Sequence, residues 1–456
     1  MKTKILTILL TFILSFSACT KDPEVVITPS VEYTITGDIT TNQTWTANNR
    51  YLLSGFVYVK NATLTIEPGT IIKGVSGTKA ALIIERGAKI IARGTATQPI
   101  VFTSDKPMGQ RASGDWGGLV LLGKATTNKH DSGTGTGIAE GGIGSLYGGT
   151  DDNDNSGVLQ YVRIEFPGIA LTATANSEIN GLTMYAVGRG TTIDHIQVSY
   201  SGDDSYEWFG GTVNCKYLVC VQGIDDEYDT DNGYRGNLQF LFGLRNPNVS
   251  DQSGSNGFES DNDADGSSLT PTTKPTFSNV TLYGPLTVSS TLPANHLFKR
   301  AMHIRRSSQL SVYNSVFVGW PKGLLLDGAL GNTPTMAESN ELQIEKVIMA
   351  GMTSDYEIAT GTLATPYILA QVTAYYTAAS RGNVTNTLTE IIGSGLISLT
   401  NPTLLPTTGS PVLIGASFTN SRLVDPFFTP VTYKGAFGTT NWTTGWCNFD
   451  PQNTNY

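Results

Sequence analysis

Short segments in which apolar and polar residues alternate, each ending in a glycine, recur along most of the chain. An alternation with a period of two is typical of a β-strand, and a glycine ends such a strand in a turn. The copies begin at Leu64, Leu82, Val162, Ile196, Tyr217, Asn279, Asn314 and Val347. The first two copies have an offset of 18, the next two have an offset of 34, and Tyr217 follows Ile196 by 21. The pattern therefore predicts a repeat of strand-plus-turn units.

Units of this length favour a solenoid, because one strand-plus-turn unit cannot bury its apolar face without stacking on a neighbour. A β-sandwich would show hairpin turns about every 8 to 12 residues. Asn180-Gly181 and Asn232-Gly233 are too few and badly placed for that. The first pair of copies has an offset of 18, and the longer offsets of the later copies favour the larger, right-handed kind of parallel β-helix. We therefore predict an all-β fold, a single right-handed parallel β-helix.

The two ends of a solenoid need cover, because an exposed terminal coil is an aggregation-prone edge. The segment from about 31 to 60, which contains Trp45 and Tyr51, is predicted to be an N-terminal cap. Residues 425–456 are rich in aromatic side chains and are predicted to be the C-terminal cap. The parallel β-helix, with acidic loop insertions, is expected within residues 31–424.

Composition supports the all-β prediction and excludes other classes. The 456 residues include 50 glycines, 39% of them are hydrophobic and only 15% are charged. A low charge with many β-branched residues argues against disorder, and sparse Ala/Glu/Lys/Leu periodicity argues against a helical protein. The GxSxG and HExxH motifs are absent, which removes the commonest serine hydrolases and zinc proteases.

The first residues resemble the signal peptide of a bacterial lipoprotein. Lys2 and Lys4 precede an apolar run, Ile5–Phe16, that is shorter than the roughly 20 residues of a membrane span. The run leads into Leu14–Cys19, which resembles a lipobox. The resemblance implies cleavage before Cys19 and acylation of that residue, so that 1–18 is a signal peptide and 19–30 a lipidated tether. An ordinary signal peptide followed by a chance cysteine is the alternative.

Thr20–Glu24 resembles the acidic export signal of surface lipoproteins in Bacteroidota. The resemblance implies a protein anchored in the outer membrane through acylated Cys19 and facing the cell exterior, with a periplasm-facing anchor as the alternative. Removal of residues 1–18 takes away two lysines and no acids, so the formal charge changes from −9 to −11. Such an acidic chain is not expected to bind nucleic acid, and its expected counter-ions are metal cations.

Acidic residues gather in a few loops, where they predict metal sites. Asp203-Asp204 and Asp225-Asp226 are separated by an offset of 22, and each pair follows a strand that ends in glycine. In a β-helix the two pairs would stack about 4.8 Å apart. Two carboxylates at that distance repel by about 3.5 kcal/mol at an effective dielectric constant of 20. A cation among them would offset this repulsion, so Asp203, Asp204, Asp225 and Asp226 are predicted metal ligands.

A third acidic loop has the spacing of half a calcium-binding loop. Asp261, Asp263 and Asp265 alternate ahead of Gly266, as the first three ligands do ahead of the glycine in an EF-hand loop. The twelfth position is Thr272 rather than glutamate, so the second half does not match. Oxygen ligands without a nearby histidine favour Ca²⁺ over zinc or copper. Ca²⁺ is therefore the predicted cofactor, with solvated, metal-free acidic loops as the alternative.

Three cysteines remain once Cys19 is acylated, namely Cys215, Cys220 and Cys447. Five positions along an extended strand would put Cys215 and Cys220 on opposite faces, roughly 16 Å apart, which is beyond disulfide reach. A pair with Cys447 stays open, and buried free thiols are the simpler expectation.

Several motifs resemble those of right-handed β-helix lipoproteins found widely in Bacteroidota. They are Glu67–Thr70, Thr97–Ser104, Asp115–Leu119, Gly210–Asn214, Asp231–Gly236, Tyr433–Phe437, Trp442-Thr443, Gly445-Trp446 and Asn448–Pro451. The resemblance covers nearly the whole mature chain. It implies the fold and a location at the cell surface or envelope, but it carries over no catalytic residues.

Cleavage of polysaccharides is an alternative, because right-handed β-helices include pectate lyases and polygalacturonases. Ile193-Asp194-His195 resembles a short lyase motif, although His195 falls within an alternating strand pattern. Gly202-Asp203-Asp204 resembles the paired aspartates of polygalacturonases, in which one acid protonates the leaving oxygen and another activates water. The catalytic candidates are Asp194, His195, Asp203, Asp204, Asp225 and Asp226.

These observations lead to one expected function and two alternatives. The expected function is a surface-anchored β-helix lipoprotein whose acidic, calcium-ordered loops bind a glycan or an outer-membrane partner protein. His303, Arg305 and Arg306 form a basic patch that could pair with these loops or serve a partner. The alternatives are a calcium-dependent polysaccharide lyase or glycoside hydrolase, and a structural or adhesive surface rod.

Overall fold

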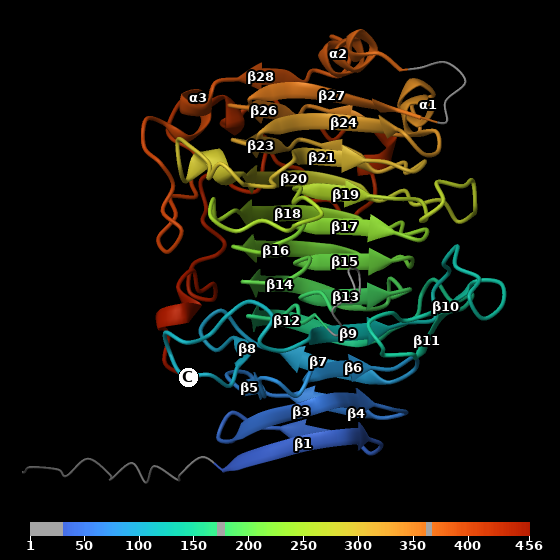
Figure 1. Ribbon diagram of the computed structural model, residues 1–456, viewed down its shortest axis with the longest axis vertical. Coiled ribbons are helices and arrows are strands. Elements are labelled where there is room, and N and C mark those ends of the chain that lie inside the picture. Colours follow the sequence, from blue (N-terminus) through green and yellow to red (C-terminus); the bar gives the residue numbers. More distant parts are fainter. Residues whose placement is uncertain (1–30, 171–177, 362–366) are drawn as a thin grey trace, which may run out of the picture.

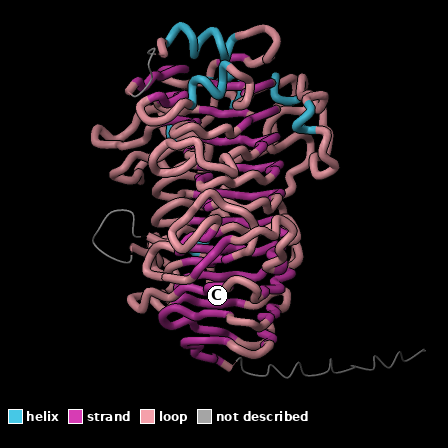
Figure 2. The backbone as a smooth tube through the Cα atoms, turned by 90° about the vertical axis from the view of Figure 1, so that its right-hand side faces the viewer, coloured by secondary structure: helices cyan, strands magenta, loops and turns pink. Residues whose placement is uncertain are grey.

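The computed structural model describes residues 31–170, 178–361 and 367–456. They form a parallel β-helix whose coils stack along the long axis (Figure 1), and a view turned by 90° shows the strands lying rung over rung (Figure 2). The predicted right-handed parallel β-helix is confirmed. Cys19 lies outside the described residues, so the signal peptide, the acylation and the tether stay predictions. Within the described part of the chain, none of the helices has the length and apolar character that a bilayer-spanning segment needs.

The strands stack into three faces. The first face contains β6 (Ala81–Ile84), β9 (Gly118–Leu122), β13 (Leu182–Tyr185), β15 (Tyr206–Phe209), β17 (Tyr228–Asp231), β19 (Phe258–Ser260), β21 (Arg300–Ile304), β24 (Lys322–Gly328) and β27 (Ser354–Thr360). The second contains β2 (Gln43–Trp45), β4 (Thr63–Ile66), β7 (Lys89–Arg93), β22 (Ser311–Tyr313) and β25 (Ile344–Glu345). The third contains β5 (Ile71–Gly74), β8 (Ile100–Ser104), β23 (Val316–Val318), β26 (Ile348–Ala350) and β28 (Val384–Asn386).

Longer strands bend and serve two faces each. β12 (Gly157–Glu165), β14 (Thr192–Ser199), β16 (Cys215–Val221), β18 (Asn237–Leu244) and β20 (Thr276–Tyr283) belong to the second face in their first halves and to the third face in their second halves. β1 (Glu32–Ile39) and β3 (Arg50–Val59) begin the stack. Their first halves belong to the third face and their second halves to the first face.

The remaining elements lie outside the coils. They are the antiparallel hairpin β10 (Thr136–Ile138) and β11 (Leu146–Gly148), the helices α1 (Thr333–Glu338), α2 (Leu369–Thr377) and α3 (Leu388–Ile392), and short 3₁₀ turns at Pro285–Thr287, Pro411–Leu413, Ser421–Leu423 and Pro451–Asn453. The hairpin packs on the outer side of β6 and β9, where Ile143 and Tyr147 bury Ile83 and Val120. α2 lies over the last coils, at the top in Figure 1.

The period-two alternation fixes which side chains of the first face point inward. One inward column is fully buried and continues from rung to rung: Leu182, Tyr206, Tyr228, Phe258, Met302 and Leu324. Since neighbours along a strand point to opposite sides, the residues that follow each of these must face outward. They include Glu207, Asp229, Glu259 and His303, which therefore form a column on the outer surface.

A left-handed residue marks the bend in each long strand. Tyr161, His195, Tyr217, Phe240 and Asn279 have φ values between 50° and 62°. The bend resets the alternation, so Cys215 and Cys220, on either side of Tyr217, both point into the core. The prediction that the two thiols lie on opposite faces is therefore wrong. Both thiols and that of Cys447 are free.

The bend also changes one of the repeat offsets. Val162 pairs with Ile196, which confirms the offset of 34. Ile196 pairs with Leu218, so the true offset is 22 rather than 21. Near the start of the helix, Leu64 pairs with Ile90 instead of Leu82. The copies that begin at Leu64 and Leu82 therefore lie on different faces of the solenoid, because β4 and β6 belong to different sides of a winding coil.

Both predicted caps have a different role. Residues 31–60 contribute β1 and β3 and are thus the first coils themselves, and β1 has β3 as its one strand partner within the described residues. The last strand is β28, after which the chain turns back along the third face. Tyr456 reaches Lys73, whose Nζ donates to its backbone oxygen at 3.3 Å. Residues 425–456 therefore cover a side of the solenoid rather than its end, because the third face has an apolar outer surface that needs cover.

Candidate functional site

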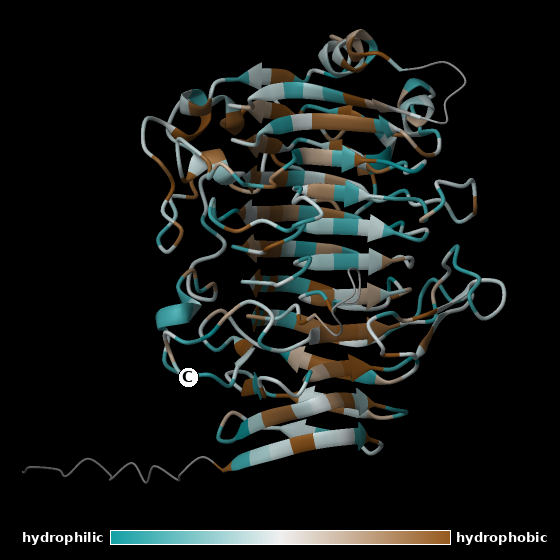
Figure 3. Cartoon of the chain, in the orientation of Figure 1, coloured by the Kyte–Doolittle hydropathy of each residue, from teal (hydrophilic) through white to brown (hydrophobic). Residues whose placement is uncertain are grey.

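The outer surface of the first face changes character along the stack. It is apolar at β6 and β9, where the hairpin covers it, and from β15 to β19 its outward positions carry acidic side chains. In Figure 3, β6 and β9 are largely brown, whereas β15 and β17 are largely white and teal. A cleft of about 570 Å³ lies over this polar part. Its lining includes eleven carboxylate side chains, five lysines and arginines, and His303. The cleft is therefore strongly acidic.

Three rows of side chains run up the cleft. The outer column of the first face supplies Glu207, Asp229 and Glu259, which are in register on β15, β17 and β19. A second row, two residues later, contains Asp231 and Asp261. The turns before β15 and β17 supply the third row, in which the Asp226 N–H donates to Asp204 Oδ1 at 2.9 Å. Rung spacing in a parallel sheet is about 4.8 Å, so carboxylates on successive rungs are held close together.

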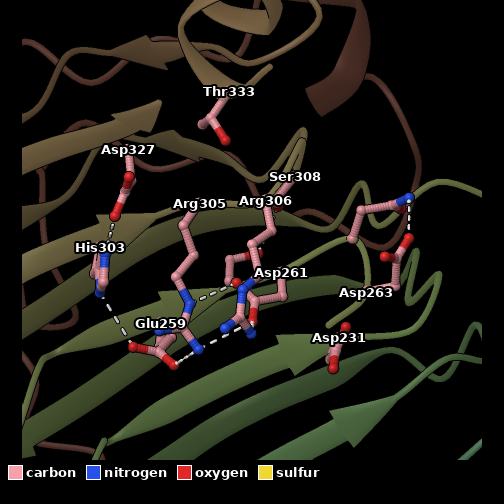
Figure 4. A network of polar contacts seen from close by, with 12 residues as sticks. Asp231, Glu259, Asp261, Asp263, His303, Arg305, Arg306, Ser308, Asp327 and Thr333 are labelled. Atoms are coloured by element: carbon pink, nitrogen blue, oxygen red, sulfur yellow. Dashed lines mark hydrogen bonds and ion pairs between the residues drawn. The ribbon is translucent and has the colours of Figure 1, made fainter. Parts of the chain in front are cut away.

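The basic residues meet the acids at one end of the cleft (Figure 4). Arg305 pairs with Glu259 and with Asp261, where Nε lies 2.6 Å from Oδ1. Arg306 pairs with the same aspartate at 2.7 Å. His303 Nδ1 lies 3.1 Å from Glu259 and its Nε2 lies 3.0 Å from Asp327. The predicted pairing of this basic patch with the acidic loops is confirmed.

These pairs set the charge states at the basic end. Burial would raise the pKa of Glu259, but the hydrogen bond with His303 and the charges of Arg305 and Arg306 leave that pKa below its usual value. Burial would lower the pKa of His303, but its contacts with Asp327 and Glu259 raise it. The charges at this end of the cleft are therefore mutually compensated.

The other end of the cleft has no such compensation. Seven carboxylates there form no ion pair with a described lysine, arginine or histidine: Asp203, Asp204, Glu207, Asp225, Asp226, Asp229 and Asp231. Burial raises the pKa of Asp203 to about 8, with contributions from neighbouring carboxylates. Burial and the charge of Glu259 raise that of Asp226 to about 7. Without a cation, these groups can only reduce their repulsion by taking up protons.

Several oxygen atoms in the cleft have no hydrogen-bond donor. Oδ1 of Asp229 is buried and unpartnered. The same is true of Oδ1 in Asn180 and Asn256, whose residues are only 3% and 2% exposed. Buried acceptors without partners are costly, and all three line the cleft. They are therefore oxygen atoms available to a bound cation.

A buried ion pair inside the solenoid positions the turn that carries Asp225 and Asp226. Arg245 and Glu227 lie in the interior, with 3.3 Å between Nη1 and Oε1. Arg245 also donates to the backbone oxygen of Asp225 at 2.5 Å and to that of Gly223 at 3.2 Å. The turn is thereby fixed from behind, so its two carboxylates stay directed at the cleft.

The structure brings together four of the predicted metal ligands and separates the other three. Asp203, Asp204, Asp225 and Asp226 all line the cleft. Asp261 lies beside them, but its carboxylate forms ion pairs with Arg305 and Arg306. Asp263 instead accepts hydrogen bonds from Asp265 N–H and from Ser267 in its own loop, and Asp265 is exposed. The three alternating aspartates therefore do not converge as a calcium loop would, because Asp261 directly follows β19 and is held by the next rung.

The lyase-like motif lies away from the cleft. Asp194 and His195 are on β14, on the second face. The His195 ring stacks between the rings of Tyr161 and Tyr217, with centroid distances of 4.3 Å on both sides. Trp446 of the C-terminal tail covers its edge. Asp194 and His195 therefore lie apart from the acidic cleft, and the ring of His195 belongs to a stacked column that the tail covers.

Sequence reasoning placed Glu207, Asp229 and Glu259 in acidic loops without assigning them as ligands. All three are outward positions of first-face strands. A signal was present, because Tyr206-Glu207 and Tyr228-Asp229 repeat an aromatic–acid pair from one rung to the next. Glu259 follows Phe258 in the same way, but a longer turn separates it from the previous rung. The carboxylates of three neighbouring strands thus join those of the turns.

Comparison with known proteins identifies the family but no individual relative. No curated protein and no solved structure matches the chain. Residues 37–393 match the family described as the pectate-lyase-like β-helix domain. This range runs from β1 through the last strand, β28, and past α3. It contains the whole acidic cleft. The chain therefore belongs to the pectate-lyase-like β-helix domain family.

Proposed function

We propose that this protein binds a glycan in the acidic cleft, with Ca²⁺ held between the cleft carboxylates and the sugar. The observation that supports this most directly is the set of seven carboxylates that no base neutralises within the described residues. Ca²⁺ takes six to eight oxygen ligands, so an ion held by carboxylates on one side keeps positions for sugar oxygens on the other. A cleft of about 570 Å³ is in the usual range for a small-ligand site, about 300–1,000 Å³.

A binding role is favoured over cleavage by the state of the basic residues. A polysaccharide lyase needs a base beside its metal ion. Although burial opposes it, the charges of Glu259 and Asp261 raise the pKa of Arg305, which therefore keeps its proton. Both nitrogens of His303 are engaged by carboxylates. The side chains at the basic end thus serve to hold the carboxylates rather than to accept a proton.

The proposal includes a surface location. Cleavage before Cys19 and acylation of that residue would anchor the protein in the outer membrane, and the tether 19–30 would join the anchor to the first coil, β1. An exterior-facing anchor would expose the cleft to glycans outside the cell. An outer-membrane protein that presents sugar-like oxygen ligands is the other partner compatible with this arrangement.

Glycan binding is tested with a panel of acidic and neutral polysaccharides, measured with Ca²⁺ and after chelation. We expect binding that disappears with the chelator and falls at least tenfold in Asp229→Asn. The matched control is Asp265→Asn, an exposed aspartate outside the cleft, which should bind like the wild type. Binding that survives both the chelator and Asp229→Asn would overturn the proposal. New reducing or unsaturated ends that vanish in Asp229→Asn would favour an enzyme instead.

The anchor is tested by expressing the wild type and Cys19→Ala in a bacterial host that acylates and exports lipoproteins. We expect the wild type in the membrane fraction, labelled by a radioactive fatty acid, and the variant unlabelled in the soluble fraction. Protease added to intact cells should degrade the wild type if the anchor faces the exterior. Fatty-acid labelling that persists in Cys19→Ala would contradict the acylation site.

A further inference from the structure

We propose that the cleft holds a row of three divalent cations, joined by Asp204 and Asp229 as bridging ligands. The inference rests on the cation binding in the proposed function and specifies its arrangement. Three sets of carboxylates bring ligand oxygens within 4.8 Å of one another: Asp203 with Asp204 and Asp225; Asp204 with Glu207 and Asp229; Asp226 with Asp229 and Glu259. Each set defines one cation position.

The shared members turn three positions into one row. Asp204 belongs to the first and second sets, and Asp229 belongs to the second and third. A carboxylate has two oxygens and can therefore contact one cation with each. Adjacent rungs are about 4.8 Å apart, which is close to the separation of about 3.5–4 Å in two-metal sites. The first two positions both lie between the coils of β15 and β17, and the third lies between β17 and β19, so the row runs across the cleft and then one step along the solenoid.

The charges of the cleft agree with three cations rather than one. The seven unpaired carboxylates carry a formal charge of −7 when ionised. One divalent cation would leave −5, whereas three would leave −1. Asp204 and Asp229 each have ligand oxygens within 4.8 Å of other carboxylates in two of the three sets, so the repulsion extends over all three. A single ion would leave most of this repulsion in place.

Unpartnered amide oxygens supply an independent indication of the ligands. Asn180 contacts Glu207 through Nδ2, while its Oδ1 has no donor. Asn256 contacts Asp226 and Glu259 through Nδ2, and its Oδ1 also has no donor. Both side chains are more than nine-tenths buried and line the cleft. Ca²⁺ accepts amide oxygens as well as carboxylates, so one such oxygen is available beside the second position and one beside the third.

The neighbouring rungs set the two ends of the row. The rung before Glu207 carries Thr183, which has no charge. The rung after Glu259 carries His303, followed two residues later by Arg305. That rung supplies basic side chains in place of carboxylates, so no fourth set of ligand oxygens follows Glu259 among the described residues. The chain therefore provides for three positions and no more within the described residues.

The test is the number of Ca²⁺ ions bound per chain, measured by native mass spectrometry on protein that has been stripped with a chelator and then given Ca²⁺ alone. We expect three ions in the wild type. Asp203→Asn removes a ligand of one position and should bind two, whereas Asp229→Asn removes a bridging ligand and should bind one. Asp265→Asn is the matched control and should keep three. Circular dichroism checks that each variant is folded.

The outcomes separate this inference from the proposed function. One ion in the wild type, or the same loss in Asp203→Asn and Asp229→Asn, would overturn the bridged row while leaving a cation-dependent binding site intact. No bound ion in the wild type would overturn both. If Asp229→Asn does not fold, Asp203→Asn decides the matter, because its side chain is only half-buried at the mouth of the row. Three ions retained in Asp203→Asn would then contradict the inference.

Discussion

Asp203 and Asp226 show how single residues report the state of the cleft. Burial raises the pKa of Asp203 to about 8, and burial together with Glu259 raises that of Asp226 to about 7. An unfolded chain releases these protons near pH 4. Between about pH 4 and about pH 8, the folded state therefore binds more protons than the unfolded state. Its free energy of unfolding falls as the pH rises through this range.

The first prediction follows for protein kept in a chelator. The stabilising contribution of these protons is complete below about pH 4 and is lost as the pH rises through about 7 and about 8. We expect the melting temperature to fall steadily from pH 5 to pH 9, as measured by differential scanning calorimetry. Saturating Ca²⁺ should remove this fall, because it binds the ionised carboxylates. A chelated protein that becomes more stable towards pH 9 would contradict the prediction.

The stacking of the His195 ring can be tested separately from its polar contact, in which Nδ1 lies 2.5 Å from Asp194 Oδ1. His195 stacks between Tyr161 and Tyr217 in a left-handed conformation that Phe240 also adopts, two rungs further on. His195→Phe should therefore stay within about 1 kcal/mol of the wild type in urea unfolding. His195→Ala should cost about 2–3 kcal/mol through lost stacking and a cavity. Neither variant should change glycan binding, whereas a loss of binding in His195→Phe would restore a functional role.

At the residue scale, the sequence predicted the cleft where repetition was simple and failed where it was not. Asp203 and Asp225 could be predicted because their spacing equals the step along the chain from β15 to β17. The place of Asp265 outside the cleft could not be predicted, because its spacing from Asp261 matches a local calcium loop, whereas Asp261 directly follows β19 and pairs with Arg305. A local motif says nothing about Arg305, which lies on the next rung.

The C-terminal tail, here residues 417–456, is the element whose course was not visible in the sequence. It is held by side-chain amides that each bind both backbone groups of a single tail residue. Gln197 does so with Asn448, Gln239 with Thr429, and Asn314 with Ser417. Because this attachment uses backbone groups of the tail, it requires no repeating pattern of hydrophobic residues in the tail sequence. Aromatic residues in 425–456 did indicate that the segment covers something, but not which surface.

Gln239 gives the sharpest test of this attachment. Its Nε2 donates to the Thr429 backbone oxygen and its Oε1 accepts from the Thr429 N–H, both at 2.8 Å. Gln239→Ala would leave two backbone groups without partners, so we expect a loss of about 2–4 kcal/mol. Limited proteolysis should then cut within the tail. Gln160→Ala is the control, since that partly exposed amide makes one contact, 3.3 Å to Asp194. Equal losses in both variants would contradict a specific attachment.

At the scale of the whole molecule, the β-helix makes the effect of the metal local. Each coil contacts only its neighbours, so the stability of a solenoid is approximately a sum over coils and the interfaces between them. The seven unpaired carboxylates of the cleft belong to β15, β17 and the turns before them, and Glu259 to β19, in the middle of the stack. The early coils around β4 and β5 carry no part of this cleft and provide an internal reference.

The last prediction is therefore a pattern of hydrogen exchange along one molecule. Removing Ca²⁺ at pH 7.5 should raise amide exchange in β15, β17 and β19, because unscreened carboxylates repel across these rungs, and should leave β4 and β5 unchanged. An ion present at about 100 times its dissociation constant adds about 2.7 kcal/mol to the folded state, which is large enough to resolve by mass spectrometry. Exchange that rises uniformly over all coils would mean that the metal acts on global folding. Exchange that changes nowhere would mean that the cleft holds its carboxylates without any cation.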